Sequence, residues 1–395
     1  MNLTGIDSLR FRSLYDLTAI PLKPLTLIIG PNGSGKSNIF KALRFLRAAV
    51  AGDASEWRAY DDESADLVWY GRTEQSKTLS QFRLLSRFGG QGISCADCAE
   101  YRTVFDANGF IEVFEEQLSL RSEGSERKLL DRTSEETELP DGSRIRTRSP
   151  HALALRDLGD SDHSCLRAVF QHIAGWRFFD VDPRLARQTS YIPEQAPVPA
   201  LDANASNLSA FLYALRENRP GDLEEVIAAM QRAIDSHPDL VIDHDGPRGG
   251  RHARYMFREA AFGERLIPAK SISDGTIRLL AHMALLLADQ SVSLACIEEP
   301  DAGLHPRLMQ HLADSLRQAV QLTTTEDTER QVLVTTHNPE FMDCFDLAEE
   351  NEYLQVLVTE RTAEGKTLVT PVTAEEFAPW LEKYRLGEAV RRRFL

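Results

Sequence analysis

A stretch near the start of the chain carries residue types suited to binding a phosphate chain. Gly30 to Ser37 reads GPNGSGKS and matches G-x-x-x-x-G-K-[ST] at every fixed position. In this pattern glycines let backbone N–H groups approach the phosphates, the lysine reaches the terminal phosphates, and the serine hydroxyl ligates Mg²⁺. We therefore expect a nucleotide to contact Asn32, Gly33, Ser34, Gly35, Lys36, Ser37 and Asn38. Within this set, Ser37 would ligate the metal and Lys36 would neutralise charge during phosphoryl transfer.

Two adjacent acids follow an apolar segment far along the chain. Leu294 to Ile297 has the composition of a buried strand, and Glu298 and Glu299 come directly after it. Ligands bind at the carboxyl ends of strands in open α/β folds. Glu298 is therefore expected to hold Mg²⁺ with its water shell, and Glu299 to orient and deprotonate an attacking water. Without the preceding strand, two acids would indicate only a solvated loop.

Two further stretches could complete such a site. Ser273, Asp274 and Gly275 precede an apolar helix and offer a hydroxyl and backbone N–H groups at its start, which suits an anion. Alone, the same triplet is more often a turn. His337 ends an apolar strand that begins at Gln331. A single histidine more often has a structural role, but this one comes at the end of an apolar strand, as the loop and the acids do.

The elements that must position these residues can be read from their flanks. Leu25 to Ile29 is a short apolar run rich in β-branched residues, as expected of a buried parallel strand. After the loop, Ile39, Leu43, Leu46 and Val50 form one face of a helix. The glycine-rich loop thus has the strand-loop-helix setting that it needs.

The rest of the chain suggests three parts. Short apolar runs over 65–120 predict an antiparallel β-subdomain, and the polar stretch 122–149 a hairpin excursion. Helical periodicity dominates from 151 to about 240, and a loop then feeds a returning strand. A strand-turn-strand and a helical end close the chain. We therefore expect an N-terminal lobe at 1–150, a mainly helical insertion at 151–265, and a C-terminal lobe at 266–395.

Composition limits the class of protein. The 395 residues carry a net charge of −15, so nucleic acid could be bound only through a local patch. The longest apolar run is too short to span a bilayer, and the N-terminus has no secretory pattern. Five cysteines fit a reducing cytoplasm, where we expect the protein, without a membrane partner.

The order of the motifs resembles the ATPase head of ABC-type proteins. In that resemblance Ser273 to Thr276 occupies the signature position, with Asp274 where the familiar form has glycine, Pro300 to His305 is the D-loop, and His337 is the switch histidine. The resemblance implies a mixed central sheet with flanking helices, an antiparallel β-subdomain and a helical insertion lobe.

Details of the motifs are similar to the SMC-related group, which includes the RecF and OLD-type (overcoming lysogenization defect) ATPases. The stretch LRFRSLYDL resembles the first strand of that group, where Arg12 would approach a nucleotide phosphate. ABC heads also have a Q-loop glutamine. Gln75 and Gln81 both lie near the expected strand, and neither is favoured.

The resemblance implies ATP and Mg²⁺ as cofactors and a second copy of the chain as a partner, in a dimer or a higher even oligomer. ATP would be enclosed between the loop of one copy and the Ser-Asp-Gly turn of the other. Hydrolysis, with Lys36, Glu299 and His337 as catalytic residues, would then release the dimer.

The biological task has competing interpretations. OLD-type nucleases carry a metal-binding TOPRIM domain after the head, and the 58 residues after His337 do not supply its acids. This favours a sensor or regulator in DNA-linked or anti-phage defence with a separately encoded effector, such as a nuclease. The alternative is a RecF-like DNA-repair ATPase that binds DNA directly. An ABC transporter subunit fits less well, because such subunits usually carry aspartate at position 298.

Two minor features remain open. Cys95 and Cys98 have metal-like spacing, but only His163 and Cys165 could complete a zinc site, so ordinary thiols are favoured. The basic run 391–393 is favoured as a solvated helix end over a DNA or partner contact.

Overall fold

The structure is a computed structural model of the chain. It describes residues 1–52, 60, 64–69, 80–90, 98–108, 110–133, 136–146, 149–159, 163–192, 198–236, 238–244, 252–258, 265–289, 291–321, 330–381 and 384–392. In this part of the chain, no helix is long and apolar enough to cross a membrane.

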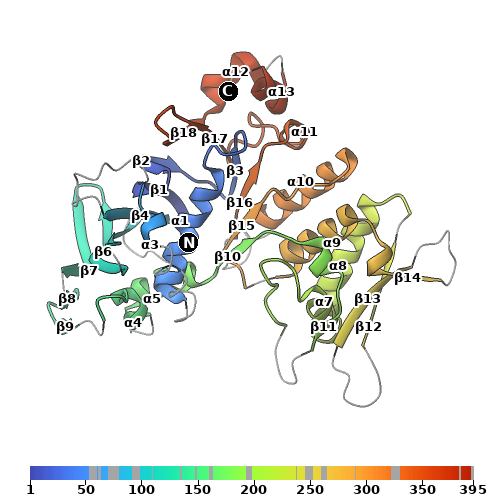
Figure 1. Ribbon diagram of the computed structural model, residues 1–395, viewed down its shortest axis with the longest axis horizontal. Helices are drawn as coiled ribbons and strands as arrows, with labels where there is room; N and C mark the ends of the chain where they lie inside the picture. The colour runs from blue at the N-terminus through green and yellow to red at the C-terminus, as the bar shows by residue number, and fades with distance from the viewer. Residues whose placement is uncertain are drawn as a thin grey trace.

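A six-stranded sheet lies at the centre of the molecule (Figure 1). Its strands, in spatial order, are β10 (Trp176–Phe179), β15 (Leu294–Glu298), β16 (Gln331–Thr336), β3 (Leu25–Ile29), β17 (Leu354–Arg361) and β18 (Thr367–Val372). The first five are parallel, and β18 returns antiparallel to β17. Every residue of β3 and β16 is buried, as expected of strands covered on both faces.

Helices cover the two faces of this sheet. Successive strand residues point to opposite faces. Ile28 joins a core with α1 (Lys36–Ala51), while Leu27 joins a separate core with α9 (Asp274–Ala288) and α10 (Pro306–Gln321). The helix that follows the glycine-rich loop and the helix that follows the Ser-Asp-Gly turn therefore lie on opposite faces of one sheet.

An eight-stranded antiparallel sheet packs beside α1 and confirms the expected β-subdomain. Its order is β2 (Leu14–Pro21), β1 (Asn2–Phe11), β4 (Gln81–Gly89), β5 (Cys98–Asp106), β6 (Glu112–Ser122), β7 (Ser125–Thr133), β8 (Glu136–Glu138) and β9 (Arg144–Arg146). The polar stretch after Ser122 thus extends this sheet as β7 to β9. Phe11, Phe82 and Phe105 form an aromatic cluster with Phe45 of α1.

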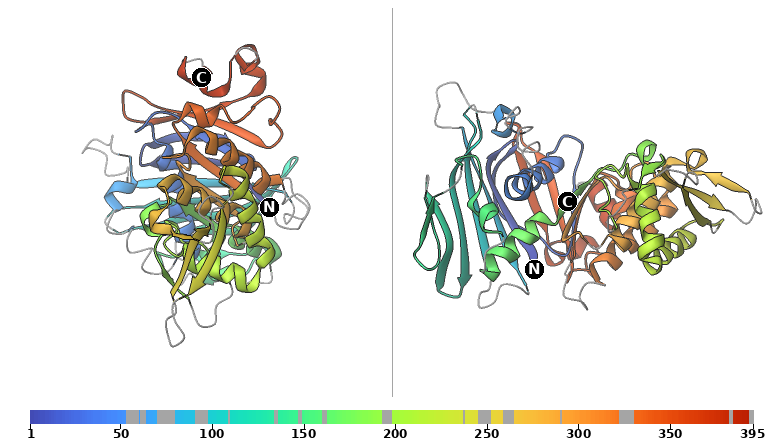
Figure 2. Two further views of the ribbon diagram at one scale, coloured as in Figure 1. Left: turned by 90° about the vertical axis from the view of Figure 1, so that its right-hand side faces the viewer. Right: turned by 90° about the horizontal axis from the view of Figure 1, so that it is seen from below.

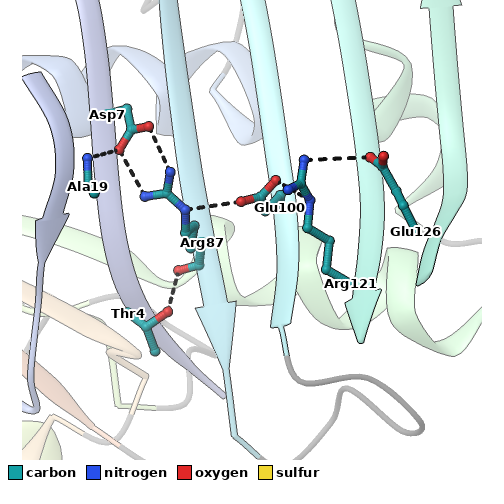
Figure 3. A network of polar contacts seen from close by, with 7 residues as sticks. All are labelled: Thr4, Asp7, Ala19, Arg87, Glu100, Arg121 and Glu126. Atoms are coloured by element: carbon teal, nitrogen blue, oxygen red, sulfur yellow. Dashed lines mark hydrogen bonds and ion pairs between the residues drawn. The ribbon is translucent and has the colours of Figure 1, made fainter. Parts of the chain in front are cut away.

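A ladder of charges crosses the strands of this sheet (Figure 3). Arg87 of β4 donates to both oxygens of Asp7, at 2.8 and 2.7 Å, and to Glu100 at 3.0 Å. Arg121 continues the ladder, at 2.6 Å from Glu100 and 3.8 Å from Glu126. Side chains of opposite charge that lie next to each other on neighbouring strands attract, and this attraction stabilises the pairing of the strands.

The insertion lobe lies at the opposite end of the molecule from the antiparallel sheet (Figure 2). It contains α6 (Pro183–Ala186), α7 (Leu208–Asn218) and α8 (Pro220–Ala233). A small antiparallel sheet accompanies them, made of β11 (Ser190–Tyr191), β12 (Asp239–His244), β13 (His252–Arg258) and β14 (Leu266–Pro268), followed by the 3₁₀ turn η3 (Ala269–Ser271). Helix α9 packs against α8, α6 and α10.

The boundary of this lobe differs from the expected residue 151. Helices α4 (Ala154–Leu158) and α5 (Ser164–Ala174) pack against α1, and β10 pairs with β15 in the central sheet. Their apolar faces join the core beneath the antiparallel sheet. We therefore place the start of the insertion after Phe179.

Short elements complete the fold. Helix α3 (Ser64–Leu67) lies beside β1, and α11 (Pro339–Met342) follows β16. The chain closes with α12 (Ala374–Leu381) and α13 (Leu386–Arg391), after the β17–β18 hairpin. This matches the strand-turn-strand and helical end expected from the sequence.

Candidate functional site

The glycine-rich loop joins the carboxyl end of β3 to the start of α1. Gly30, Gly33 and Gly35 all have positive φ angles. A Cβ on Gly35 would lie 1.9 Å from Thr367 Oγ1, and one on Gly30 would lie 2.4 Å from the carbonyl oxygen of Thr359. A side chain at Gly30 or Gly35 would therefore clash with the β17–β18 hairpin behind the loop. The sequence motif alone does not reveal this reason for glycine at the two positions.

The open side of the loop is free to receive a ligand. Asn32 and Gly33 are exposed, and a Cβ on Gly33 would meet no atom of the described residues within 4 Å. Ser34 is buried and its hydroxyl lies 2.7 Å from Thr359 Oγ1, so it anchors the loop to β17. Gly30, Gly33 and Gly35 therefore shape a cradle whose back packs on the β17–β18 hairpin and whose other side is exposed.

Lys36 lies within the cradle. Its ammonium group donates to the carbonyl oxygens of Gly30, at 2.7 Å, and Pro31, at 3.0 Å. Burial lowers the pKa of Lys36, and the nearby Glu299 raises it in part. A phosphate oxygen in the cradle could replace these carbonyl partners.

The metal-binding residues expected from the sequence meet here. Ser37 donates its hydroxyl hydrogen to Glu298 Oε2 at 3.0 Å, although 261 residues separate the two. A hydroxyl and a carboxylate oxygen are the hard ligands that Mg²⁺ takes beside water and phosphate. The donor set thus fits the metal. The side-chain amide of Asn38 donates instead to the hydroxyl oxygen of Ser13 at 2.6 Å.

Glu299 and His337 also meet at this edge of the sheet. His337 Nδ1 lies 2.9 Å from Glu299 Oε1, and both side chains are partly exposed. The N–H group of Glu299 donates to the carbonyl oxygen and hydroxyl of Thr335 on β16, at 3.0 and 3.2 Å. Adjacent parallel strands thus place the acid and the histidine together.

Arg12 lies at the turn between β1 and β2, next to Ser13 and so next to α1. It lines a cavity of about 790 Å³ together with Lys41 and Arg44 of α1. This position is near the loop, as the resemblance implied, and its contact with a phosphate stays a prediction.

The Ser-Asp-Gly turn is built as a helix start but stands apart from the loop. Ser273 is the N-cap of α9 and accepts from the N–H group of Thr276 at 3.2 Å. Asp274 pairs with Arg187. A Cβ on Gly275 would lie 2.9 Å from the carbonyl oxygen of Gly303, so the turn packs directly on the D-loop. The turn therefore belongs to the α9 face of the sheet.

Comparison with known proteins identifies the family. Residues 25–343 match the model of the family described as "AAA domain, putative AbiEii toxin, Type IV TA system". This range covers most of the chain, from β3 to α11. The chain belongs to this AAA domain family.

Solved structures similar to this AAA domain are SMC heads. A crystal structure of the SmcHead bound to the C-winged helix domain of ScpA has a TM-score of 0.59 at 15% identity, covering 95% of this chain and 99% of that chain. The Smc head with an extended coiled coil, bound to the C-terminal domain of ScpA from Pyrococcus furiosus, has a TM-score of 0.54 at 15% identity, covering 96% and 98%. At such identities the likeness concerns the fold.

One curated protein adds a local match. The chromosome partition protein Smc of Xanthomonas oryzae pv. oryzae (strain KACC10331 / KXO85) is 38% identical over 82 residues, which are 20% of this chain and 7% of that protein. The chain thus matches only a small part of its length. Together these findings confirm the expected fold, a mixed α/β P-loop head of the kind seen in SMC proteins.

The structure assigns neither of the two candidate Q-loop glutamines to the site. Gln81 begins β4 of the antiparallel sheet, and Gln75 lies outside the described residues. On the side of β15 away from β16, the edge strand of the central sheet is β10, where Phe179 pairs with Ile297. The exposed Asp180 follows Phe179 as Glu298 follows Ile297, so it is a polar residue at this edge that was not among the expected site residues. Its signal was a short apolar run ending in an acid, the same pattern as at Glu298.

The remaining sequence features lie away from this edge. Cys98 begins β5, Cys95 is outside the described residues, and no group of three or more metal-ligating side chains occurs among the residues that are described. Arg391 lies 3.6 Å from Asp343 and Arg392 lies 3.0 Å from Glu388, so acids of the same chain accompany these two cations.

Proposed function

We propose that this AAA domain is an ATPase that closes as a head-to-tail dimer with ATP and Mg²⁺ between the two copies. The observation that carries the proposal is the placement of α1 and α9 on opposite faces of the central sheet. The loop of one copy has no Ser-Asp-Gly turn of its own chain in front of it. A second copy could supply that turn to each loop.

In this proposal each residue at the carboxyl edge of the sheet has one task. Lys36 would exchange its carbonyl partners for phosphate oxygens and neutralise their charge. Ser37 and Glu298 would hold Mg²⁺, which supplies positive charge beside the phosphates. Glu299 would take a proton from the attacking water, and His337 would orient the Glu299 carboxylate.

The biological role that we propose is a sensor or regulator with a separately encoded effector, in phage defence or another DNA-linked process. Two findings support it. The description of the family names a toxin, and the matched SMC heads are bound to domains of a second protein, ScpA. By analogy, ATP-driven closure would change a surface that a partner protein recognises.

The test uses Glu299→Gln, which keeps the size of the side chain and removes the base. With ATP and Mg²⁺ we expect this variant to remain a dimer in mass photometry, and its ATP turnover to fall by about 100-fold or more. Lys36→Ala is the control, because it lacks the phosphate contact and should stay monomeric. A dimer that forms equally well without nucleotide contradicts the proposal.

A further inference from the structure

An ion pair stands on the turn that would face the nucleotide of the second copy. Asp274 is the first residue of α9, and its side chain is 69% exposed. The guanidinium of Arg187, which is 20% exposed, contacts Asp274 Oδ1. Arg187 also donates from Nε to the carbonyl oxygen of Pro183 at 3.1 Å, so α6 holds the guanidinium in place.

The position of Asp274 is fixed by its neighbours on both sides. Ser273 caps the helix through Thr276, and Gly275 has no room for a side chain against Gly303 of the D-loop. The backbone of the turn is therefore fixed, and the contact with Arg187 sets the direction of the Asp274 carboxylate.

A carboxylate at this place opposes the binding of a phosphate. Like charges a few ångströms apart repel strongly where water is excluded. The paired Arg187 cancels the charge of Asp274 and leaves the Ser273 hydroxyl and the nearby N–H groups to receive an anion.

We propose that Arg187 is a positioning residue of the shared nucleotide site. It neutralises Asp274, so that the Ser-Asp-Gly turn accepts the terminal phosphate of the nucleotide held by the partner copy. This inference rests on the proposed ATP-dependent dimer and adds to it a charge pair that the sequence motif does not contain.

The experiment measures the dimer dissociation constant in the Glu299→Gln chain with saturating ATP and Mg²⁺. Adding Arg187→Ala should weaken the dimer by about tenfold or more, because an uncompensated carboxylate then meets the phosphate. Adding Asp274→Asn to that variant should restore the constant to within about threefold, because the amide keeps the shape and lacks the charge. Arg254→Ala, in the same lobe, is the matched control. Its guanidinium is 46% exposed and paired with Asp243, so it should change the constant by less than about twofold.

Binding of a fluorescent ATP analogue to the monomer and the melting temperature separate the effect from misfolding. Both should be unchanged in Arg187→Ala. The inference is overturned if Arg187→Ala dimerises as well as its parent, or if Asp274→Asn fails to restore a folded Arg187→Ala chain. Failure of the Glu299→Gln parent to dimerise with ATP would instead count against the proposed function itself.

Discussion

Glu299 has an unusual backbone for its residue type. Its φ angle is 41°, in the left-handed region that non-glycine residues seldom adopt and that costs of the order of 1 kcal/mol. Two hydrogen bonds from its N–H group to Thr335 hold this conformation. The turn carries the carboxylate of Glu299 out of the strand and toward His337. Strain at this residue, supported by β16, is consistent with the role of base that we propose for it.

His282 gives a prediction for stability in acid. It lies in α9, fully buried, and neither ring nitrogen has a hydrogen-bond partner in the described part of the chain. Burial lowers its pKa to about 3, from 6.5. Between these values the unfolded chain binds more protons than the folded one, so stability falls as the pH falls below 6.5. From pH 7 to pH 5 this residue alone should cost about 2 kcal/mol of unfolding free energy.

The variant His282→Leu should remove that cost. We expect it to be at least as stable as the parent at pH 7, since it removes an unpaired polar group, and clearly more stable at pH 5. Urea unfolding at the two pH values measures the difference. His163→Leu is the control, because its exposed ring is in water in both states. An equal loss of stability in acid for His282→Leu and the parent would contradict the assignment.

Among the elements, α4 is tied to the antiparallel sheet through one buried acid. Glu116 of β6 is fully buried and accepts from the N–H groups of Ala154 and Leu155, at 2.6 and 2.9 Å, at the start of α4. Tyr101 donates to it at 2.7 Å, and the buried Arg132 lies 3.9 Å away. Burial raises the pKa of Glu116, and the N–H groups, Tyr101 and Arg132 oppose the rise.

Removal of this acid should therefore be costly. Glu116→Ala leaves two helix N–H groups and a buried guanidinium without their carboxylate, and we expect a loss of about 3–5 kcal/mol in chemical unfolding. Tyr101→Phe removes a single hydrogen bond at the same place and should cost only about 1 kcal/mol. If the two variants unfold at the same denaturant concentration, α4 does not depend on Glu116.

The elements also show what the sequence could and could not predict. β3, α1, β15 and β16 were predictable, because each is a local apolar pattern next to a motif. The membership of β10 in the central sheet was not, because its four residues pair with β15, more than a hundred positions later. The pair of Arg187 and Asp274 was hidden for the same reason, since 87 residues separate them. Local periodicity contains no information on such pairings.

At the scale of the whole molecule, the shared site makes a prediction about mixtures of variants. In the proposed dimer each site takes its loop from one copy and its Ser-Asp-Gly turn from the other. Lys36→Ala damages the loop, and Ser273→Ala damages the turn without adding bulk. Each variant alone has two defective sites. In a mixed dimer both defects fall in one site, and the other site is intact.

An equal mixture should therefore recover ATP turnover that neither variant has alone. Homodimers of either variant have no intact site and should not persist, whereas each mixed dimer has one intact site out of two, so the recovery is at most about half of the parent activity. The measurement is phosphate release against the fraction of each variant, which should peak at equal amounts. The control is a chain carrying both substitutions, mixed with either single variant, because no intact site can then form. A mixture of the single variants that stays as inactive as this control would mean that the loop and the turn do not meet across two copies, and that the placement of α1 and α9 on opposite faces has another purpose.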